Sequence, residues 1–258
     1  MRNIINIFRF IIENNTWTAV PKKIASAFYY QLHKRFCSIP KIKTLFNGYK
    51  IYLFHNNPVT TAFVYTDVPD RDEIEALRNL ADGNTIFLDV GANVGTYSLL
   101  LKDKVANVYA FEAHPKTAEL CRINFALNNI RVEQVLDYVV SDNEEPKQFT
   151  DLQEGNPMNS RAIHNEPGII VPSMTLDAFI QKKGFKKETP FLIKIDVEGF
   201  EHEVFAGAKA FLSDYYVKGI VFENFSSYQQ SIVDMLKGLG YKTTAIGKHN
   251  TLAVRNKD

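Results

Sequence analysis

From residue 85 onward, short apolar runs alternate with stretches of helical periodicity. Short strands separated by helices need crossover connections, which produce a parallel sheet with helices on both faces. The apolar runs predict strands at 85–90, 107–111, 132–140, 191–196 and 218–223. The periodic stretches predict helices at 94–102, 115–127, 200–212 and 227–238, with a further helix opening in "SMTLDAFI".

The last part of the chain breaks this alternation. "YKTTAIGK" and "TLAVRN" are separated only by "HN", so they predict two strands joined by a short turn. Two successive strands without a helix must pair antiparallel. The sequence therefore predicts an α/β, Rossmann-like doubly wound fold with a mostly parallel seven-stranded sheet and one antiparallel strand near its edge. The polar stretch 142–171 predicts a long loop or hairpin of the kind that is functional or mobile.

The N-terminal part differs in charge and pattern. Residues 1–50 contain nine Lys or Arg residues and one acid, a net charge of +8. Apolar residues recur at helical spacing from Ile4 to Ile12, and a second helix is expected from Pro21. We predict a basic amphipathic helical extension at 1–47 and a catalytic domain at 48–258. The extension is either a surface that contacts a membrane or a phosphate-bearing substrate, or a helical cap packed on the main domain.

Cysteine content and hydropathy set the expected compartment. Cys37 and Cys121 form no spacing pattern, so two free thiols in a reducing cytosol are expected. Arg9 and Asn6 interrupt the first apolar run, and no cleavage site for a signal peptide follows it. The expected location is cytoplasmic, with peripheral contact at the membrane as the alternative.

A glycine loop, "FLDVGANVGTYS", follows the first strand of the predicted sheet and opens a helix. Doubly wound sheets bind ligands at this position. Gly91 and Gly95 permit a tight turn around Asn93, and Asp89 precedes the loop. Asp89 would repel a pyrophosphate but suits an ammonium group. Glu112, which closes the next strand, suits the hydroxyls of a ribose.

These two acids together indicate a ligand that joins adenosine to a zwitterionic amino acid, which is S-adenosylmethionine. Asp142, at the exit of the third strand, is within expected reach of the adenine amino group. The competing explanation is that the glycines serve only a turn and that an acid after a strand has no ligand.

"FLIKIDVEGFEHEVF" (191–205) places charge in a segment that should be buried. Lys194 needs an acidic partner inside a buried strand, either Asp196 or Glu223. Glu201 falls on the apolar arc of the following helix, where it is expected to face Lys194. These groups form either an active site or a structural ion network. Glu198 and His202 have the i to i+4 spacing of a pair of metal ligands, but a solvated helix face explains them better. No metal site is therefore predicted.

Together, "FLDVGANVGTYS", "AFEAHP", "MTLDAF" and "IKIDVEGFEHEVFAGA" closely resemble the FkbM-type S-adenosylmethionine-dependent methyltransferases over about residues 48–225. The resemblance implies a Rossmann-like class I methyltransferase domain. It also implies methyl transfer, usually to an oxygen of a sugar or polyketide-like acceptor. The resemblance also implies which residues bind the cofactor and which acid lies at the methyl-transfer end. The cofactor-binding positions are Asp89, Gly91, Asn93, Gly95, Glu112 and Asp142, and the acid at the methyl-transfer end is Asp196.

The expected reaction is an in-line displacement in which the protein aligns donor and acceptor and removes a proton. Asp196 is the preferred base, Lys194 is the alternative, and Glu201 belongs to the same group. The expected partner is a small-molecule or glycan acceptor. A nucleic-acid or protein methyltransferase is the rival enzyme, although residues 51–258 are net acidic and repel phosphate. A non-catalytic S-adenosylmethionine-binding protein is the rival outside enzymes, and the sequence predicts no oligomeric state.

Overall fold

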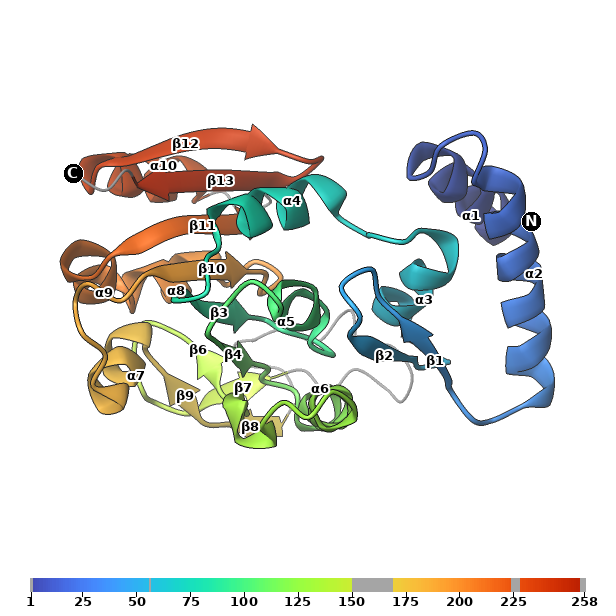
Figure 1. Cartoon of the computed structure of the whole chain (residues 1–258). Coiled ribbons are helices and arrows are strands. Elements are labelled where there is room, and N and C mark those ends of the chain that lie inside the picture. Colours follow the sequence, from blue (N-terminus) through green and yellow to red (C-terminus); the bar gives the residue numbers. More distant parts are fainter. Residues whose placement is uncertain (1, 56, 150–168, 224–227, 256–258) are drawn as a thin grey trace. The chain divides into compact units, whose positions relative to one another are not determined.

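A computed structural model describes residues 2–55, 57–149, 169–223 and 228–255 (Figure 1). The chain forms two compact units, Met1–Asp70 and Arg71–Asp258. The first is mainly helical, and the second is built on a seven-stranded sheet. Residues 150–168 of the predicted long loop lie outside the described residues, as do residue 227 of a predicted helix and residue 256 of a predicted strand.

In its described residues, the first unit contains three helices and one hairpin. These are α1 (Arg2–Glu13), α2 (Val20–Phe36), β1 (Lys41–Thr44), β2 (Lys50–Leu53) and α3 (Pro58–Tyr65). Pro21 lies in the first turn of α2, where its missing N–H costs no hydrogen bond. The Asn57 side chain caps α3 by accepting from the Thr60 N–H. Ile11, Ile51 and Phe63 are buried here and give the unit its own core.

The unit boundary falls at 70/71, whereas the sequence led us to expect 47/48. The difference comes from β2, which pairs antiparallel with β1, so "GYKIYLF" belongs to the first unit. Lys43, on β1, donates to the carbonyl oxygens of Phe63 and Thr66 and to Asp67, which holds the end of α3 to the hairpin. Lys23 of α2 pairs with the same Asp67 at 2.6 Å.

The second unit contains the predicted sheet. Its strand order is β12–β13–β11–β10–β3–β4–β5. The strands are β3 (Ile86–Val90), β4 (Asn107–Phe111), β5 (Val135–Leu136), β10 (Phe191–Ile195), β11 (Val217–Glu223), β12 (Tyr241–Ile246) and β13 (Asn250–Arg255). β13 runs antiparallel to both neighbours, while β11, β10, β3, β4 and β5 pair in parallel. The sheet is thus mostly parallel, with one antiparallel strand next to its edge, as predicted.

Helices cover both faces of this sheet (Figure 1). One face is covered by α4 (Arg71–Leu80), α5 (Thr96–Leu101) and α6 (Pro115–Leu127). The other face is covered by α7 (Leu176–Lys183), α8 (Glu201–Ala206), α9 (Lys209–Asp214) and α10 (Gln229–Gly238). This is the arrangement that right-handed crossovers produce when the strand order runs in both directions from β3.

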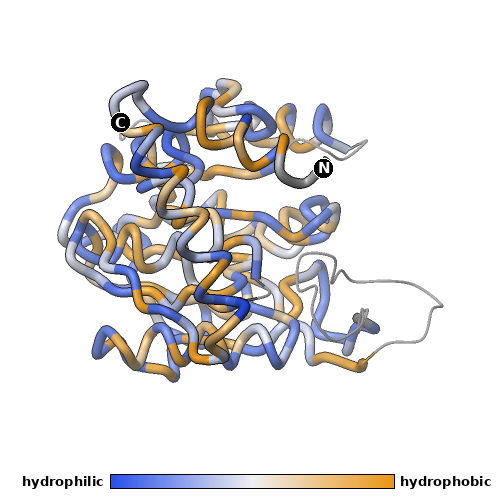
Figure 2. Tube along the Cα trace, turned by 90° about the vertical axis from the view of Figure 1, so that its right-hand side faces the viewer, coloured by the Kyte–Doolittle hydropathy of each residue, from blue (hydrophilic) through white to orange (hydrophobic). Residues whose placement is uncertain are grey.

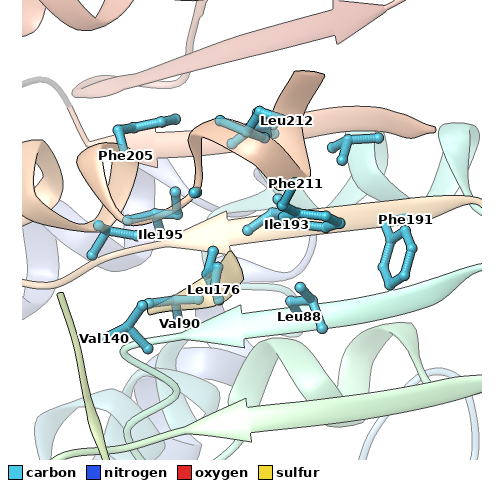
Figure 3. Packing of buried hydrophobic residues seen from close by; sticks show 14 of the residues in the cluster. Leu88, Val90, Val140, Leu176, Phe191, Ile193, Ile195, Phe205, Phe211 and Leu212 are labelled. Carbon is cyan, nitrogen blue, oxygen red and sulfur yellow. The ribbon is translucent and has the colours of Figure 1, made fainter. Parts of the chain in front are cut away.

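The main core lies between the sheet and the second group of helices. Figure 3 shows Leu88 and Val90 of β3 and Ile193 of β10 on the sheet side, with Phe205 and Phe211 from the helices. Alternate residues of each strand point to this core, so Asp89 and Lys194 point to the opposite face, toward α5. The same alternation that builds the core therefore puts two charged residues side by side on adjacent strands.

Two predicted elements are divided. The expected strand 132–140 becomes a 3₁₀ turn (Val132–Gln134), β5 and a separate β6 (Val139–Val140), which pairs with β9 (Ser173–Met174). The chain leaves the main sheet at Asp137, which pairs with Arg122 of α6. The polar stretch that follows contains the hairpin β7 (Lys147–Phe149) and β8 (Ile169–Val171).

The expected helix 200–212 is interrupted between α8 and α9. A Cβ on Gly207 would lie 2.0 Å from the carbonyl oxygen of Ser141, so this glycine permits a close backbone contact. The Asp177 carboxylate, on α7, accepts from the N–H groups of Ala210 and Phe211 and so holds the start of α9.

Candidate functional site

The carboxyl ends of four neighbouring parallel strands bring together the acids that the sequence singled out. Asp89 lies at the end of β3, Glu112 follows β4, Asp196 follows β10 and Glu223 ends β11. Parallel strands end at the same edge of a sheet, and this edge is where doubly wound folds bind ligands. Candidate binding and catalytic residues therefore share one edge.

The glycine loop turns sharply after β3. The N–H groups of Gly91 and Ala92 both donate to the Phe111 carbonyl oxygen at the end of β4. Gly91 and Gly95 have φ values of 78° and 82°, a region that other residues rarely adopt. A Cβ on Gly91 would lie 1.8 Å from the carbonyl oxygen of Asp196, so the loop packs directly against the end of β10.

Gly95 is needed for a different contact. A Cβ there would lie 2.8 Å from Cys121 Sγ and 3.0 Å from a ring carbon of Phe125, both on α6. Asn93 also has a positive φ, 51°, which asparagine tolerates better than most residues. All three loop positions singled out by the sequence are thus fixed by backbone geometry or by neighbouring helices.

Asp89 is buried and points to the start of α5. Its Oδ2 accepts two hydrogen bonds from Ser98, at 2.9 Å from the backbone N–H and 2.7 Å from the hydroxyl. Burial raises the pKa of Asp89 to about 6, although the Ser98 bonds and the Lys194 charge act to lower it. Among the described residues, no hydrogen bond is formed by Oδ1, which leaves that oxygen for a ligand.

Glu112 holds the glycine loop through both carboxylate oxygens. Oε2 accepts from the Asn93 N–H at 2.8 Å, and Oε1 accepts from the His114 N–H at 2.9 Å. Burial raises the pKa of Glu112 to about 7, while these two backbone donors act to lower it. A carboxylate offers about four acceptor positions, so Glu112 keeps room for two more donors such as the hydroxyls of a ribose.

Asp142 lies after β6, outside the main sheet. Its Oδ1 accepts from the Ser141 hydroxyl and from the Asn143 side-chain amide, both at 2.9 Å. Lys147 lies 3.7 Å away, and the Asp142 side chain is 45% exposed. Unlike the two buried acids, this one is partly accessible to solvent.

Lys194 is paired as its burial requires. The side chain is 3% exposed, and Nζ lies 2.9 Å from Asp196 Oδ2 and 4.9 Å from the centre of the Tyr97 ring. Asp196 supplies the acidic partner, one of the two that the sequence offered. The Asp196 side chain is 43% exposed, so this ion pair has one buried and one accessible member.

Glu201, in the first turn of α8, is buried and binds the loop that precedes the helix. Its Oε1 accepts from the N–H groups of Val197 and Gly199 at 3.3 and 3.2 Å. Its Oε2 is buried and has no hydrogen-bond partner among the described residues. The sequence led us to expect that Glu201 faces Lys194. In the structure its carboxylate accepts hydrogen bonds from the backbone of the loop after β10.

Two further residues belong to this edge: Glu223, which the sequence offered only as a possible partner of Lys194, and Thr96, which it did not single out. Burial raises the pKa of Glu223 to about 7, and the carboxylates of Asp196, Glu198 and Glu201 add to the increase. Thr96 Oγ1, directly after the glycine loop, is buried without a hydrogen-bond partner in the described residues. The signal for Glu223 was present in "GIVFEN", where an acid closes an apolar strand just as Glu112 does.

The described residues contain no group of three or more His, Cys, Asp or Glu side chains placed to hold a metal ion. The candidate site is therefore built from carboxylates, one lysine and backbone groups.

Comparison with known proteins assigns the family. Residues 89–243, more than half of the chain, match the model described as the Methyltransferase FkbM domain. The chain belongs to the FkbM methyltransferase family. The matched domain is a methyltransferase domain, and S-adenosylmethionine is its cofactor. The donor set fits this cofactor, because two buried carboxylates flank a glycine loop at the ligand-binding edge.

Individual relatives of this FkbM methyltransferase are distant. The hexuronic acid methyltransferase AglP of Haloferax volcanii is 28% identical over 144 residues, which cover 54% of this chain and 56% of that protein. The chain thus spans just over half the length of this curated relative. Among solved structures, precorrin-6y C5,15-methyltransferase from Geobacter metallireducens has a TM-score of 0.42 at 10% identity, covering 71% of this chain and 87% of that one. Magnesium protoporphyrin IX methyltransferase from Synechocystis has a TM-score of 0.38 at 15% identity, with coverages of 71% and 75%.

Proposed function

We propose that this FkbM methyltransferase transfers a methyl group to an oxygen of a small-molecule acceptor, a hydroxyl of a sugar or glycan. Two facts support the acceptor class: the FkbM domain and the similarity of part of the chain to AglP, a hexuronic acid methyltransferase. The observation that carries the proposal is the ion pair of Lys194 and Asp196, which lies where β10 touches the glycine loop.

We assign cofactor binding to the β3–β4 side of the edge. Glu112 is proposed to accept the two ribose hydroxyls on its remaining acceptor positions. Asp89, through Oδ1, is proposed to accept from the ammonium group, and Asp142 from the adenine amino group. Asn93, Gly91 and Gly95 shape the loop between them. When bound, S-adenosylmethionine supplies an electrophilic methyl group on a sulfonium.

We assign acceptor chemistry to the end of β10. Asp196 is proposed to accept the proton of the acceptor hydroxyl, because an alcohol attacks poorly until a base takes that proton. Lys194 holds the Asp196 carboxylate in place through their 2.9 Å contact. Glu201 fixes the loop that follows Asp196 by accepting from two of its N–H groups.

Asp196→Asn tests this assignment. The amide keeps the shape of the side chain but removes the base, so we expect turnover to fall by about 10²- to 10⁴-fold. The dissociation constant for S-adenosylmethionine, measured by calorimetry, should stay within about threefold, a change of roughly 0.7 kcal/mol. Turnover is measured by mass spectrometry on a panel of uronic acid and neutral sugar glycosides.

Asp214→Asn is the matched control. Asp214 forms a surface ion pair with Lys187, and both residues precede the strands whose carboxyl ends carry the candidate site. This substitution should leave both quantities unchanged. If Asp196→Asn turns over as fast as the wild type, Asp196 is not the base. Nuclear magnetic resonance of the product locates the new methyl group, and a methyl group on nitrogen or carbon would contradict the proposed acceptor atom.

A further inference from the structure

Exposed apolar side chains are concentrated in the first unit. The described residues include 14 large apolar side chains that are exposed, and 11 of them lie in Met1–Asp70. Only three belong to the much longer second unit. Scattered exposed apolar residues are normal, but a concentration of this kind marks an interaction surface. The 11 are Ile5, Phe8, Ile12, Trp17, Phe28, Tyr29, Leu32, Phe36, Ile39, Ile42 and Phe46.

Helix α2 carries a continuous part of this surface. Projected at 100° per residue, Phe28, Leu32, Phe36 and Tyr29 fall within one arc of the helix. Their exposed fractions are 68%, 42%, 80% and 62%. The residues that α2 buries, among them Ala27 and Tyr30, lie on the opposite side. The helix is therefore apolar on both faces, and only one face is used inside the unit. In Figure 2, apolar positions recur along this part of the tube between polar ones.

Basic residues border the exposed arc. On the same projection, Lys22 lies at one edge and Arg35 at the other, and both are exposed. Lys41 Nζ lies 3.6 Å from the centre of the Tyr29 ring, so a third cation lies on the aromatic part of the arc. The unit as a whole has nine Lys or Arg residues and three acids, a net charge of +6.

The arc has the properties of a helix that lies in the interface of a membrane. Such helices place aromatic and aliphatic side chains among the acyl chains and basic side chains at the headgroups. No helix among the described residues is long and apolar enough to cross a bilayer. Lys22 and Arg35 lie within α2 at the two edges of the arc, which suits a helix lying flat on a charged surface.

We propose that the exposed arc of α2, defined by Phe28, Tyr29, Leu32 and Phe36 and bordered by Lys22 and Arg35, binds the surface of an anionic phospholipid bilayer. The basic residues at the edges of the arc favour an anionic bilayer over an apolar protein surface as the partner. An apolar protein face would leave the bordering cations without partners, whereas anionic headgroups supply a partner for each. The proposal concerns the first unit alone and does not depend on the acceptor proposed above.

Co-sedimentation of the full chain with vesicles tests the proposal. We use vesicles of phosphatidylcholine alone and vesicles containing 30% phosphatidylserine, a composition that we choose as roughly that of an anionic surface. Binding should require the anionic lipid and weaken as salt is raised. Lys22→Gln and Arg35→Gln should each lower the partition coefficient about fivefold at low salt. Phe28→Ser, Leu32→Ser and Phe36→Ser combined should lower it more than a hundredfold.

Matched substitutions on the second unit are the control. Ile170→Ser and Lys186→Gln change an exposed apolar and an exposed basic side chain there, and neither should alter binding. Circular dichroism and thermal unfolding verify that each variant is folded. Failure of the wild-type chain to bind anionic vesicles, or equal binding by the triple variant, overturns the proposal.

A fluorescent reporter places the arc directly. Trp17 is the only tryptophan, so Trp17→Phe combined with Phe28→Trp gives a single reporter on the arc. Its emission should shift to shorter wavelength when anionic vesicles are added, and an unchanged spectrum contradicts the proposal. Light scattering tests a second copy of the chain as the occupant. A dimer that the triple variant dissociates, with no vesicle binding by the wild type, would replace the bilayer by a subunit interface.

Discussion

The two halves of the strand-end edge treat their carboxylates differently. On the β3–β4 side, Asp89 and Glu112 are buried, and backbone N–H groups already bind both of them. On the β10–β11 side, Asp196 is 43% exposed and pairs with a side chain, that of Lys194, and Glu223 is only partly buried. A carboxylate held by fixed donors is preorganised for binding. A carboxylate with fewer fixed partners retains its capacity to accept a proton.

This difference suggests a division of labour within one site. The bound carboxylates hold the glycine loop and the start of α5, and in the proposed function the less restrained Asp196 is the group that meets the acceptor. The two sides remain connected, because Gly91 packs against the backbone of Asp196. Three changes test whether the sides are as distinct as their contacts indicate.

Gly91→Ala should have the largest effect, because it breaks the contact that joins the two sides. The new Cβ would overlap the Asp196 carbonyl oxygen, and the backbone would remain at a φ of 78°. We expect a loss of about 3 kcal/mol or more in the free energy of unfolding, measured by urea denaturation. Gly184→Ala is the control: it has a φ of 65° with open space around the added carbon, so it should cost only about 1–2 kcal/mol. Equal losses in the two variants would show that backbone strain, and not the contact with Asp196, explains the requirement.

Glu112→Gln tests the bound side alone. A glutamine has one acceptor oxygen, so it cannot accept from both Asn93 and His114 and also bind two hydroxyls. Affinity for S-adenosylmethionine, measured by calorimetry, should fall about 10- to 100-fold, which corresponds to roughly 1.4–2.7 kcal/mol. Glu119→Gln changes an exposed acid on α6 and should leave the affinity unchanged. An equal loss in that control would point to net charge as the cause.

Glu223→Gln should give the smallest effect, seen in the pH dependence of stability. The folded pKa of Glu223, about 7, lies above its ordinary value, so the folded state holds a proton that the unfolded state has released between about pH 4.5 and 7. Stability from this group is therefore present at low pH and lost as pH rises through 7. After allowance for solvent screening, the loss is about 1 kcal/mol.

The measurement is the difference in free energy of unfolding between the wild type and Glu223→Gln from pH 5 to 8. Taking this difference cancels the other titrating groups, including Glu112, whose pKa is raised in the same direction. A difference that does not vary with pH would mean that Glu223 titrates at its ordinary value. The raised pKa of Glu223 would then be contradicted.

The sequence predicted the regular part of the second unit closely. The strand 107–111 and the helix 115–127 were placed at their observed bounds, because apolar alternation and Pro115 define them locally. The antiparallel β13 followed from two strands without a helix between them. Local pattern could not reveal that β6 leaves the main sheet, since β6 pairs with β9, a strand that lies much further along the chain.

At the candidate site, the sequence predicted which residues lie at the strand-end edge better than it predicted their contacts. The need of Lys194 for an acid was evident from its position in a buried strand, and Asp196 fills it. The contacts of Glu201 were not evident, because a helical projection gives a direction but not the fold of the preceding loop. The sequence also showed only part of the role of Gly91. A glycine indicates that some neighbouring group approaches the backbone closely, and only the folded chain shows that this group is the Asp196 backbone.

The contact of Gly91 with Asp196 also limits how the site can change. With no Cβ between them, a movement of the loop toward β10 has no room, and a movement of the strand end toward the loop has none either. New acceptors would therefore have to be accommodated by substitutions in the surrounding segments. A backbone contact thereby sets the distance between the glycine loop and the end of β10.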